Sequence, residues 1–92
     1  MPRYEITGEW SGYHSHQRRV CHREYTTDKE FADKVRDLGF IRYTDGTTLD
    51  IRMRQLRKGE RRQPEVRGYS SLIRDCVKHD TNSVADLPAE RD

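Results

Sequence analysis

A run of arginines in the middle of the chain carries the clearest chemical signal in the sequence. Residues 51–67 contain seven basic side chains and only two acidic ones. The planar guanidinium group donates paired hydrogen bonds that suit phosphates and carboxylates. We therefore predict a binding surface for phosphates or for an acidic protein patch, with a solvated charged face as the alternative interpretation. The candidate binding residues here are Arg52, Arg54, Arg57, Lys58, Arg61 and Arg62.

Aromatic side chains lie in a polar segment nearer the N-terminus. Trp10 and Tyr13 stand on either side of Gly12, and the basic pair Arg18-Arg19 follows. Aromatic rings beside cations can stack on bases or pack into a protein interface. We expect Trp10 in the core and keep Tyr13 as a candidate binding residue.

Histidines and cysteines supply enough atoms for a metal site, but not in a recognised arrangement. A structural zinc ion needs three or four ligands that converge on one point. The available groups match no standard spacing, and Cys76 falls on the apolar stripe of a predicted helix. We therefore predict no metal and no cofactor. The groups considered are His14-x-His16, Cys21-His22 and Cys76-x-x-His79.

A catalytic pair is the third chemical option. His22 and Glu24 occupy alternate positions of a predicted strand, so that they share a face and could act as base and orienting group. An ion pair on the surface explains them equally well. The sequence contains no phosphate-binding loop, no nucleophile elbow and no recognisable carboxylate pair. We therefore expect a protein that is not an enzyme.

Length and composition indicate what kind of fold carries these residues. The chain has 92 residues, of which 32% are hydrophobic and 37% are charged, with a net charge of +2. This length predicts one domain over residues 1–88, followed by a frayed tail at 89–92. The apolar residues recur with clear periodicity, which argues against disorder. The small core is compatible with a monomer or a homodimer.

Cellular location is predicted from what the sequence contains. Two cysteines do not make a disulfide framework. The sequence has neither a charged and apolar leader nor a long apolar run. We expect a cytoplasmic protein with reduced thiols and no contact with a membrane.

The first half of the chain predicts two strands and a helix. Residues 3–10 alternate, with Tyr4, Ile6 and Trp10 on one side, and residues 18–26 form a second strand after a loop at 11–17. A helix follows over 28–38, capped reciprocally by Thr27 and Glu30. Gly39 ends it in the left-handed conformation. Its apolar face carries Phe31, Val35 and Leu38.

Residues 40–56 predict a hairpin that turns at Asp45-Gly46. A two-residue loop would mix polar and apolar side chains on both faces. A three-residue loop with a bulge at Gly46 instead pairs Ile41 with Leu49 and segregates them. The apolar face then holds Ile41, Tyr43, Leu49, Ile51 and Met53, and the polar face holds Arg42, Thr48, Asp50, Arg52 and Arg54.

The last third predicts an exposed basic loop at 57–67 and a second helix from about 70 to 79. A short final turn through Leu87 is capped by Asn82 or Ser83 and stopped by Pro88. The resulting order is β-β-α-β-β-α. We predict an α+β fold, an antiparallel four-stranded sheet with two helices on one face. The apolar stripe of the second helix consists of Leu72, Ile73, Cys76 and Val77.

Several segments together resemble small accessory proteins of bacteriophages and prophages: YEITGEWSGY, QRRVCHREYTTDKEF, IRYTDGTTL and RGYSSLIRDC. This resemblance implies a role in host takeover or counter-defence, performed by binding and blocking a host protein. It implies no particular catalytic or binding residues.

Three hypotheses about function follow. The first is a non-enzymatic interaction module that binds a host protein, such as one acting on nucleic acid, through the arginine-rich sheet face and loop. The second is direct binding of nucleic acid by the same surface, with an affinity that falls steeply with salt. The third is a small hydrolase or nuclease that depends on His22 and Glu24.

Overall fold

The computed structural model describes residues 2–11 and 20–88. The elements follow the predicted order, and the predicted short turn near the end is a 3-10 helix that begins after Ser83. They are β1 (Tyr4–Ser11), β2 (Val20–Thr26), α1 (Lys29–Leu38), β3 (Phe40–Arg42), β4 (Thr48–Gln55), α2 (Ser70–Lys78) and η1 (Val84–Asp86).

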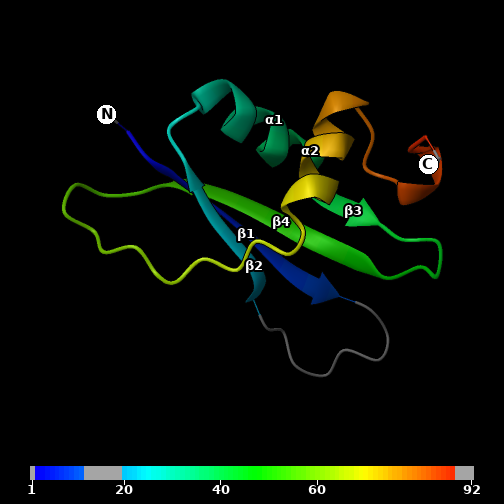
Figure 1. Ribbon diagram of the computed structural model, residues 1–92, viewed down its shortest axis with the longest axis horizontal. Helices are drawn as coiled ribbons and strands as arrows, with labels where there is room; N and C mark the ends of the chain where they lie inside the picture. Colours follow the sequence, from blue (N-terminus) through cyan, green and yellow to red (C-terminus); the bar gives the residue numbers. More distant parts are fainter. Residues whose placement is uncertain (1, 12–19, 89–92) are drawn as a thin grey trace.

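The strands form one antiparallel sheet in the order β2-β1-β4-β3. Figure 1 shows α1 and α2 side by side on the same face of this sheet. The predicted α+β fold is therefore confirmed. Because β1 and β4 are the two central strands, side chains on the open face of β1 lie between those of β2 and β4.

The hairpin of β3 and β4 has the predicted bulged turn. Ile41 lies opposite Leu49. The Gly46 N–H donates to the Tyr43 carbonyl at 3.0 Å, and the Tyr43 N–H donates to Thr47 at 2.8 Å. Gly46 has a φ of 89°, which a residue with a side chain rarely adopts. This register places the apolar side chains of β4 beneath the helices and Arg52 on the open face.

The start of α1 differs from the prediction. The N-cap is Asp28, whose Oδ1 accepts the Phe31 N–H at 3.1 Å. The predicted reciprocal cap of Thr27 and Glu30 is therefore wrong. Asp28 performs the same task one residue later, since a carboxylate is as good an N-cap as a hydroxyl. Gly39 ends the helix with a φ of 72°, as predicted.

The core lies between the sheet and the two helices. It contains apolar side chains from β1, β3, β4 and both helices, and the predicted apolar stripes all contribute to it. The helical stripes pack on the sheet because their spacing brings every third or fourth residue to one side. Its fully buried members are Ile6, Val35, Ile41, Leu49, Ile73 and Cys76.

Short backbone bridges cover part of each edge of the sheet. On β2, Arg23 and Val66 exchange two backbone hydrogen bonds of 2.9 and 3.0 Å. On β3, the Arg42 N–H donates to the Asn82 carbonyl at 2.7 Å. Unpaired strand edges invite association with other chains, and such bridges block it. The bridge at Val66 also binds the segment between β4 and α2 to the sheet.

Candidate functional site

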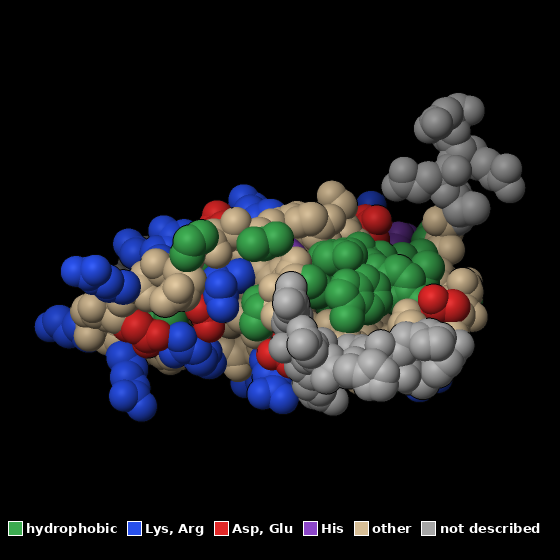
Figure 2. All heavy atoms as spheres, turned by 90° about the horizontal axis from the view of Figure 1, so that it is seen from below, with side chains coloured by type: hydrophobic (Ala, Val, Ile, Leu, Met, Phe, Trp, Pro, Cys, Tyr) green, Lys and Arg blue, Asp and Glu red, His purple; other side chains and the backbone are tan. Residues whose placement is uncertain are grey.

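Most of the predicted binding residues lie in one segment, residues 57–67, which we call the basic loop. The side chains of Arg57, Lys58 and Arg61 are exposed and form no ion pair or hydrogen bond with any residue that the structure describes. Arg52 is likewise exposed on the open face of β4, as predicted. Lys and Arg side chains gather at the end of the molecule that carries this loop (Figures 1 and 2).

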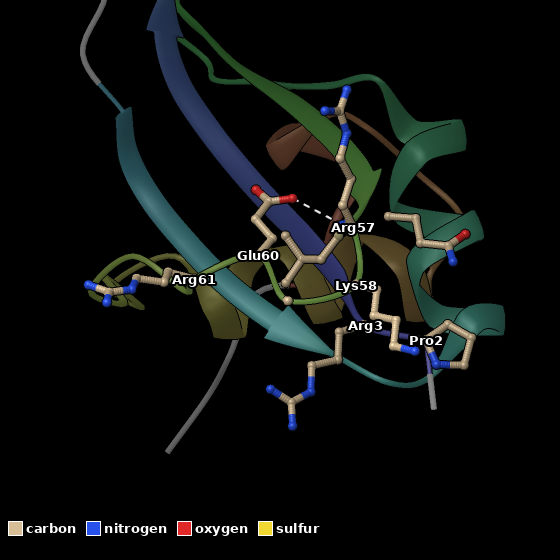
Figure 3. Close-up of a pocket in the computed structure, with 9 residues that line it drawn as sticks. Pro2, Arg3, Arg57, Lys58, Glu60 and Arg61 are labelled. Carbon is tan, nitrogen blue, oxygen red and sulfur yellow. Dashed lines mark hydrogen bonds between the residues drawn. The ribbon is translucent and has the colours of Figure 1, made fainter.

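A pocket of about 620 Å³ opens at the base of the basic loop. Four cations line it, because Arg3 from the start of β1 joins Arg57, Lys58 and Arg61. In Figure 3 the guanidinium groups of Arg3, Arg57 and Arg61 point in different directions, and Lys58 extends toward Pro2. Since the cations diverge, they suit an extended acidic surface better than one small anion.

The basic loop begins with a tight turn over residues 57–60. The Glu60 N–H donates to the Arg57 carbonyl at 3.0 Å, and Gly59 has a φ of 80°. A glycine with positive φ at the third position is typical of a type II turn. The Glu60 side chain closes the turn a second time, because its Oε1 accepts the Arg57 N–H at 3.0 Å.

Arg54 lies between the sheet and this turn. Its Nε donates to Glu5 at 2.9 Å, and its two terminal nitrogens donate to the two oxygens of Glu60. The hydrogen bond from Arg54, helped by the Arg57 N–H, lowers the pKa of Glu60 to about 2. All three donor nitrogens of Arg54 are thus already occupied within the protein, unlike those of Arg57 and Arg61.

The middle of the basic loop is bound to β2. The Gln63 N–H donates to the Tyr25 hydroxyl at 2.7 Å, and that hydroxyl donates to Glu5 at 3.0 Å. Arg62, another predicted binding residue, lies over the Tyr25 ring at 4.7 Å and pairs with Glu65 at 3.2 Å. Glu5, which is nearly buried, thus supports the loop at two places, through Arg54 and through Tyr25.

A second polar cluster lies beneath α2. His22 and Glu24 are completely buried, with His22 Nε2 at 3.1 Å from Glu24 Oε1. Arg74 of α2 donates from both terminal nitrogens to Glu24 at 3.2 and 3.1 Å, and Arg67 approaches it at 3.5 Å. The interpretation of His22 and Glu24 as a surface pair is wrong, because their face of β2 points toward the helices.

Burial and hydrogen bonding act in opposite directions on Glu24. Burial alone would raise the pKa of Glu24, but hydrogen bonds from His22 and Arg74 outweigh it and lower that pKa to about 2. A carboxylate with so low a pKa is a poor proton acceptor near neutral pH. The cluster joins α2 to β2, and α2 begins directly after the basic loop.

Acid should weaken this junction. Because the pKa of Glu24 is about 2 in the folded protein and 4.5 without the fold, its stabilising effect is complete above pH 4.5. The effect is lost as the pH falls toward 2. We expect the melting temperature to fall over this range, and to fall less in Glu24→Gln, which has no carboxyl group to titrate there. Equal slopes in the two proteins would contradict the assignment.

Aromatic side chains gather away from the basic loop. Trp10 lies 4.9 Å from Tyr43 and 5.5 Å from Tyr69 between ring centres, and its Nε1 donates to the Tyr69 hydroxyl at 3.2 Å. Trp10 packs against the core, as predicted. Figure 2 shows an apolar patch toward the opposite end from the cations. The predicted Tyr13 lies outside the described residues.

Neither a metal cluster nor a membrane helix emerges from the described chain. Within residues 2–11 and 20–88, no three His, Cys, Asp or Glu side chains come together as ligands would. His14 and His16 are not among these residues. In the same ranges, no helix has the length and apolar character required to cross a membrane.

Comparison of the chain with protein-family models, curated proteins and solved structures gives no match. The fold and the site therefore define the class directly. The chain is a small α+β protein with a four-stranded antiparallel sheet, two helices on one face, and a basic loop fixed to the sheet.

Three features of the site were not predicted from the sequence. Arg3 was not predicted, although it borders the same pocket as Arg57, because its position depends on the pairing of β1 with β4. The ion pair of Arg54 with Glu5 depends on the same pairing, and its ion pair with Glu60 depends on the turn over residues 57–60. The burial of Glu24 depends on which face of β2 the helices cover. Arg23 and Glu24 are adjacent in the sequence and so lie on opposite faces of β2, and charge alone did not show which face is buried.

Proposed function

We propose that this protein is a non-enzymatic interaction module whose basic loop binds an acidic surface of another protein. The observation that carries the proposal is the set of exposed cations around one pocket, Arg3, Arg57, Lys58 and Arg61, on a loop bound to the sheet. Nearby carboxylates Glu60 and Glu65 are already paired with arginines. Unpaired cations on a fixed backbone are suited to recognising a surface of opposite charge.

The arrangement of the aromatic rings favours a protein partner over single-stranded nucleic acid. Proteins that bind single strands stack bases on exposed rings beside the cations. Tyr25 is the described ring that borders the basic loop, and the Arg62 guanidinium lies over it. Trp10, Tyr43 and Tyr69 pack together elsewhere. The resemblance to phage accessory proteins supports a bacterial host protein as the partner, which this module would inhibit or modulate.

Charge reversal tests the proposal. Arg57→Glu with Arg61→Glu changes the net charge by −4, from +2 to −2. We expect this variant to lose affinity for the partner by about tenfold or more, since the two glutamates would repel an acidic surface that the two arginines attract. Lys34→Glu with Lys78→Glu causes the same change on the helices and should bind like the wild type. The measurement is affinity purification from a bacterial lysate treated with nuclease, followed by titration of the recovered polypeptide.

The outcomes separate the hypotheses. Recovery of one polypeptide that resists nuclease and depends on Arg57 and Arg61 supports the module. Recovery that nuclease abolishes, with an affinity that falls steeply with salt, supports binding of nucleic acid instead. Equal losses in both variants would mean that only net charge matters, and the basic loop would not be the site.

A further inference from the structure

Glu60 is a carboxylate in the turn that begins the basic loop, where its charge should repel an acidic partner. From its charge alone, Glu60 would be expected to weaken the binding of an acidic partner. We infer that Glu60 is instead a positioning residue, which strengthens binding by fixing the turn that carries Arg57 and Lys58. This inference rests on the proposed function and adds to it the group that shapes the site.

Each oxygen of Glu60 has a partner that restricts the loop. Oε1 accepts the Arg57 backbone N–H at 3.0 Å and an Arg54 nitrogen at 3.1 Å, while Oε2 accepts the other terminal nitrogen of Arg54. The first contact closes the turn. The contacts with Arg54 bind the turn to β4. Glu60 thus joins the start of the basic loop to the sheet in two directions.

The support extends into the sheet. Arg54 is itself held by Glu5, which is only 7% exposed, at 2.9 Å. Glu5, Arg54 and Glu60 therefore form a continuous line of charge-assisted hydrogen bonds from the face of β1 to the turn. Such bonds are about twice as strong as neutral ones. A turn supported in this way presents Arg57 and Lys58 without first having to become ordered.

Preordering matters because binding otherwise has to immobilise the side chains and the loop. The negative charge of Glu60 costs little at the site, since the guanidinium of Arg54 lies against it. Removing Glu60 would therefore strengthen the attraction to an acidic partner slightly through charge and weaken binding more through disorder of the turn. The two effects have opposite signs, which makes them separable by experiment.

Glu65 provides the matched control. It is also in the basic loop, and its one described ion pair is with Arg62 at 3.2 Å. Glu60→Ala and Glu65→Ala each add one positive charge to the protein, but only the first opens the turn. The probe is fluorescent poly-L-glutamate, titrated at fixed low ionic strength with anisotropy as the signal. Exchange of the Arg57 amide hydrogen is followed in the same proteins.

We expect Glu60→Ala to bind the probe about threefold to tenfold more weakly than the wild type. Glu65→Ala should bind equally well or more tightly, and the Arg57 amide should exchange faster only in Glu60→Ala. If both variants bind more tightly, or if Glu60→Ala weakens binding without faster exchange, the inference is wrong while the proposed function stands. If the wild type does not bind, or Arg57→Glu with Arg61→Glu binds unchanged, the proposed function fails and the inference with it.

Discussion

Replacement of Arg74 by methionine is expected to lower the free energy of unfolding by about 3 kcal/mol. Arg74 supplies two of the hydrogen bonds that Glu24 receives, at 3.2 and 3.1 Å, and Glu24 is only 1% exposed. Without Arg74, a buried carboxylate keeps only His22 and the more distant Arg67 as partners. Methionine keeps part of the aliphatic stem but removes the guanidinium group, which lies over the Phe31 ring. The measurement is unfolding by urea at neutral pH.

Two further variants test the cause of this loss. Lys78→Met removes the same charge one turn later on α2, from an exposed position, and should change stability by less than about 0.5 kcal/mol. Arg74→Met combined with Glu24→Gln should recover much of the loss, because the buried charge is then gone. If the double variant is as unstable as the sum of the single ones, the burial of an unpaired carboxylate is not the reason.

Local patterns predicted the parts of the fold that neighbouring residues determine. Ile41 and Leu49 lie opposite each other because only the bulged turn keeps apolar side chains on one face. Arg52 points outward for the same reason. The stripes of both helices followed from their spacing. These features depend on residues at most a few positions apart, so a sequence contains them directly.

The polar clusters could not be predicted because they depend on pairings over long separations in the chain. Glu24 pairs with Arg74, fifty residues later, only because α2 lies across β2. On β2, the register shifts opposite Gly8 and Glu9, so that Val20 pairs with Glu9 and is 38% exposed while His22 is buried. Regular alternation would instead have placed Val20 and His22 on the same side of this strand. Glu24 is buried against Arg74 and His22, whose Nδ1 has no hydrogen-bond partner among the described residues.

For the same reason, the sequence predicted which segment forms the site but not how its arginines differ. The run of arginines identified the basic loop, but residue type alone does not distinguish one arginine of this run from another. The structure separates Arg57 and Arg61, which are exposed and unpaired among the described residues, from Arg54, whose nitrogens are occupied by Glu5 and Glu60. This division follows from the strand order, which places Glu5 between β2 and β4. Glu5 is accordingly the residue whose replacement should affect both stability and binding.

Glu5→Gln is expected to lower the free energy of unfolding by about 2 kcal/mol and to loosen the basic loop at both of its supports. The glutamine side chain has the same shape but no charge, and its amide cannot accept at both ends. It therefore loses one of two hydrogen bonds, from Arg54 at 2.9 Å or from the Tyr25 hydroxyl at 3.0 Å, and weakens the other because the charge is gone. It also loses the pairing with Arg23 at 3.6 Å.

Glu9→Gln is the control, because Glu9 lies on the same strand and the same face and is more exposed. It should unfold like the wild type. In Glu5→Gln the amide hydrogens of Arg57 and Gln63 should both exchange faster, since each is bound to a partner that Glu5 holds in place. Faster exchange at Arg57 alone would show that Tyr25 keeps its position without Glu5, and unchanged exchange at both would refute the role of Glu5. A loop that loosens only when this buried carboxylate is neutralised would mean that the sheet, rather than the loop's own sequence, determines where its cations are presented.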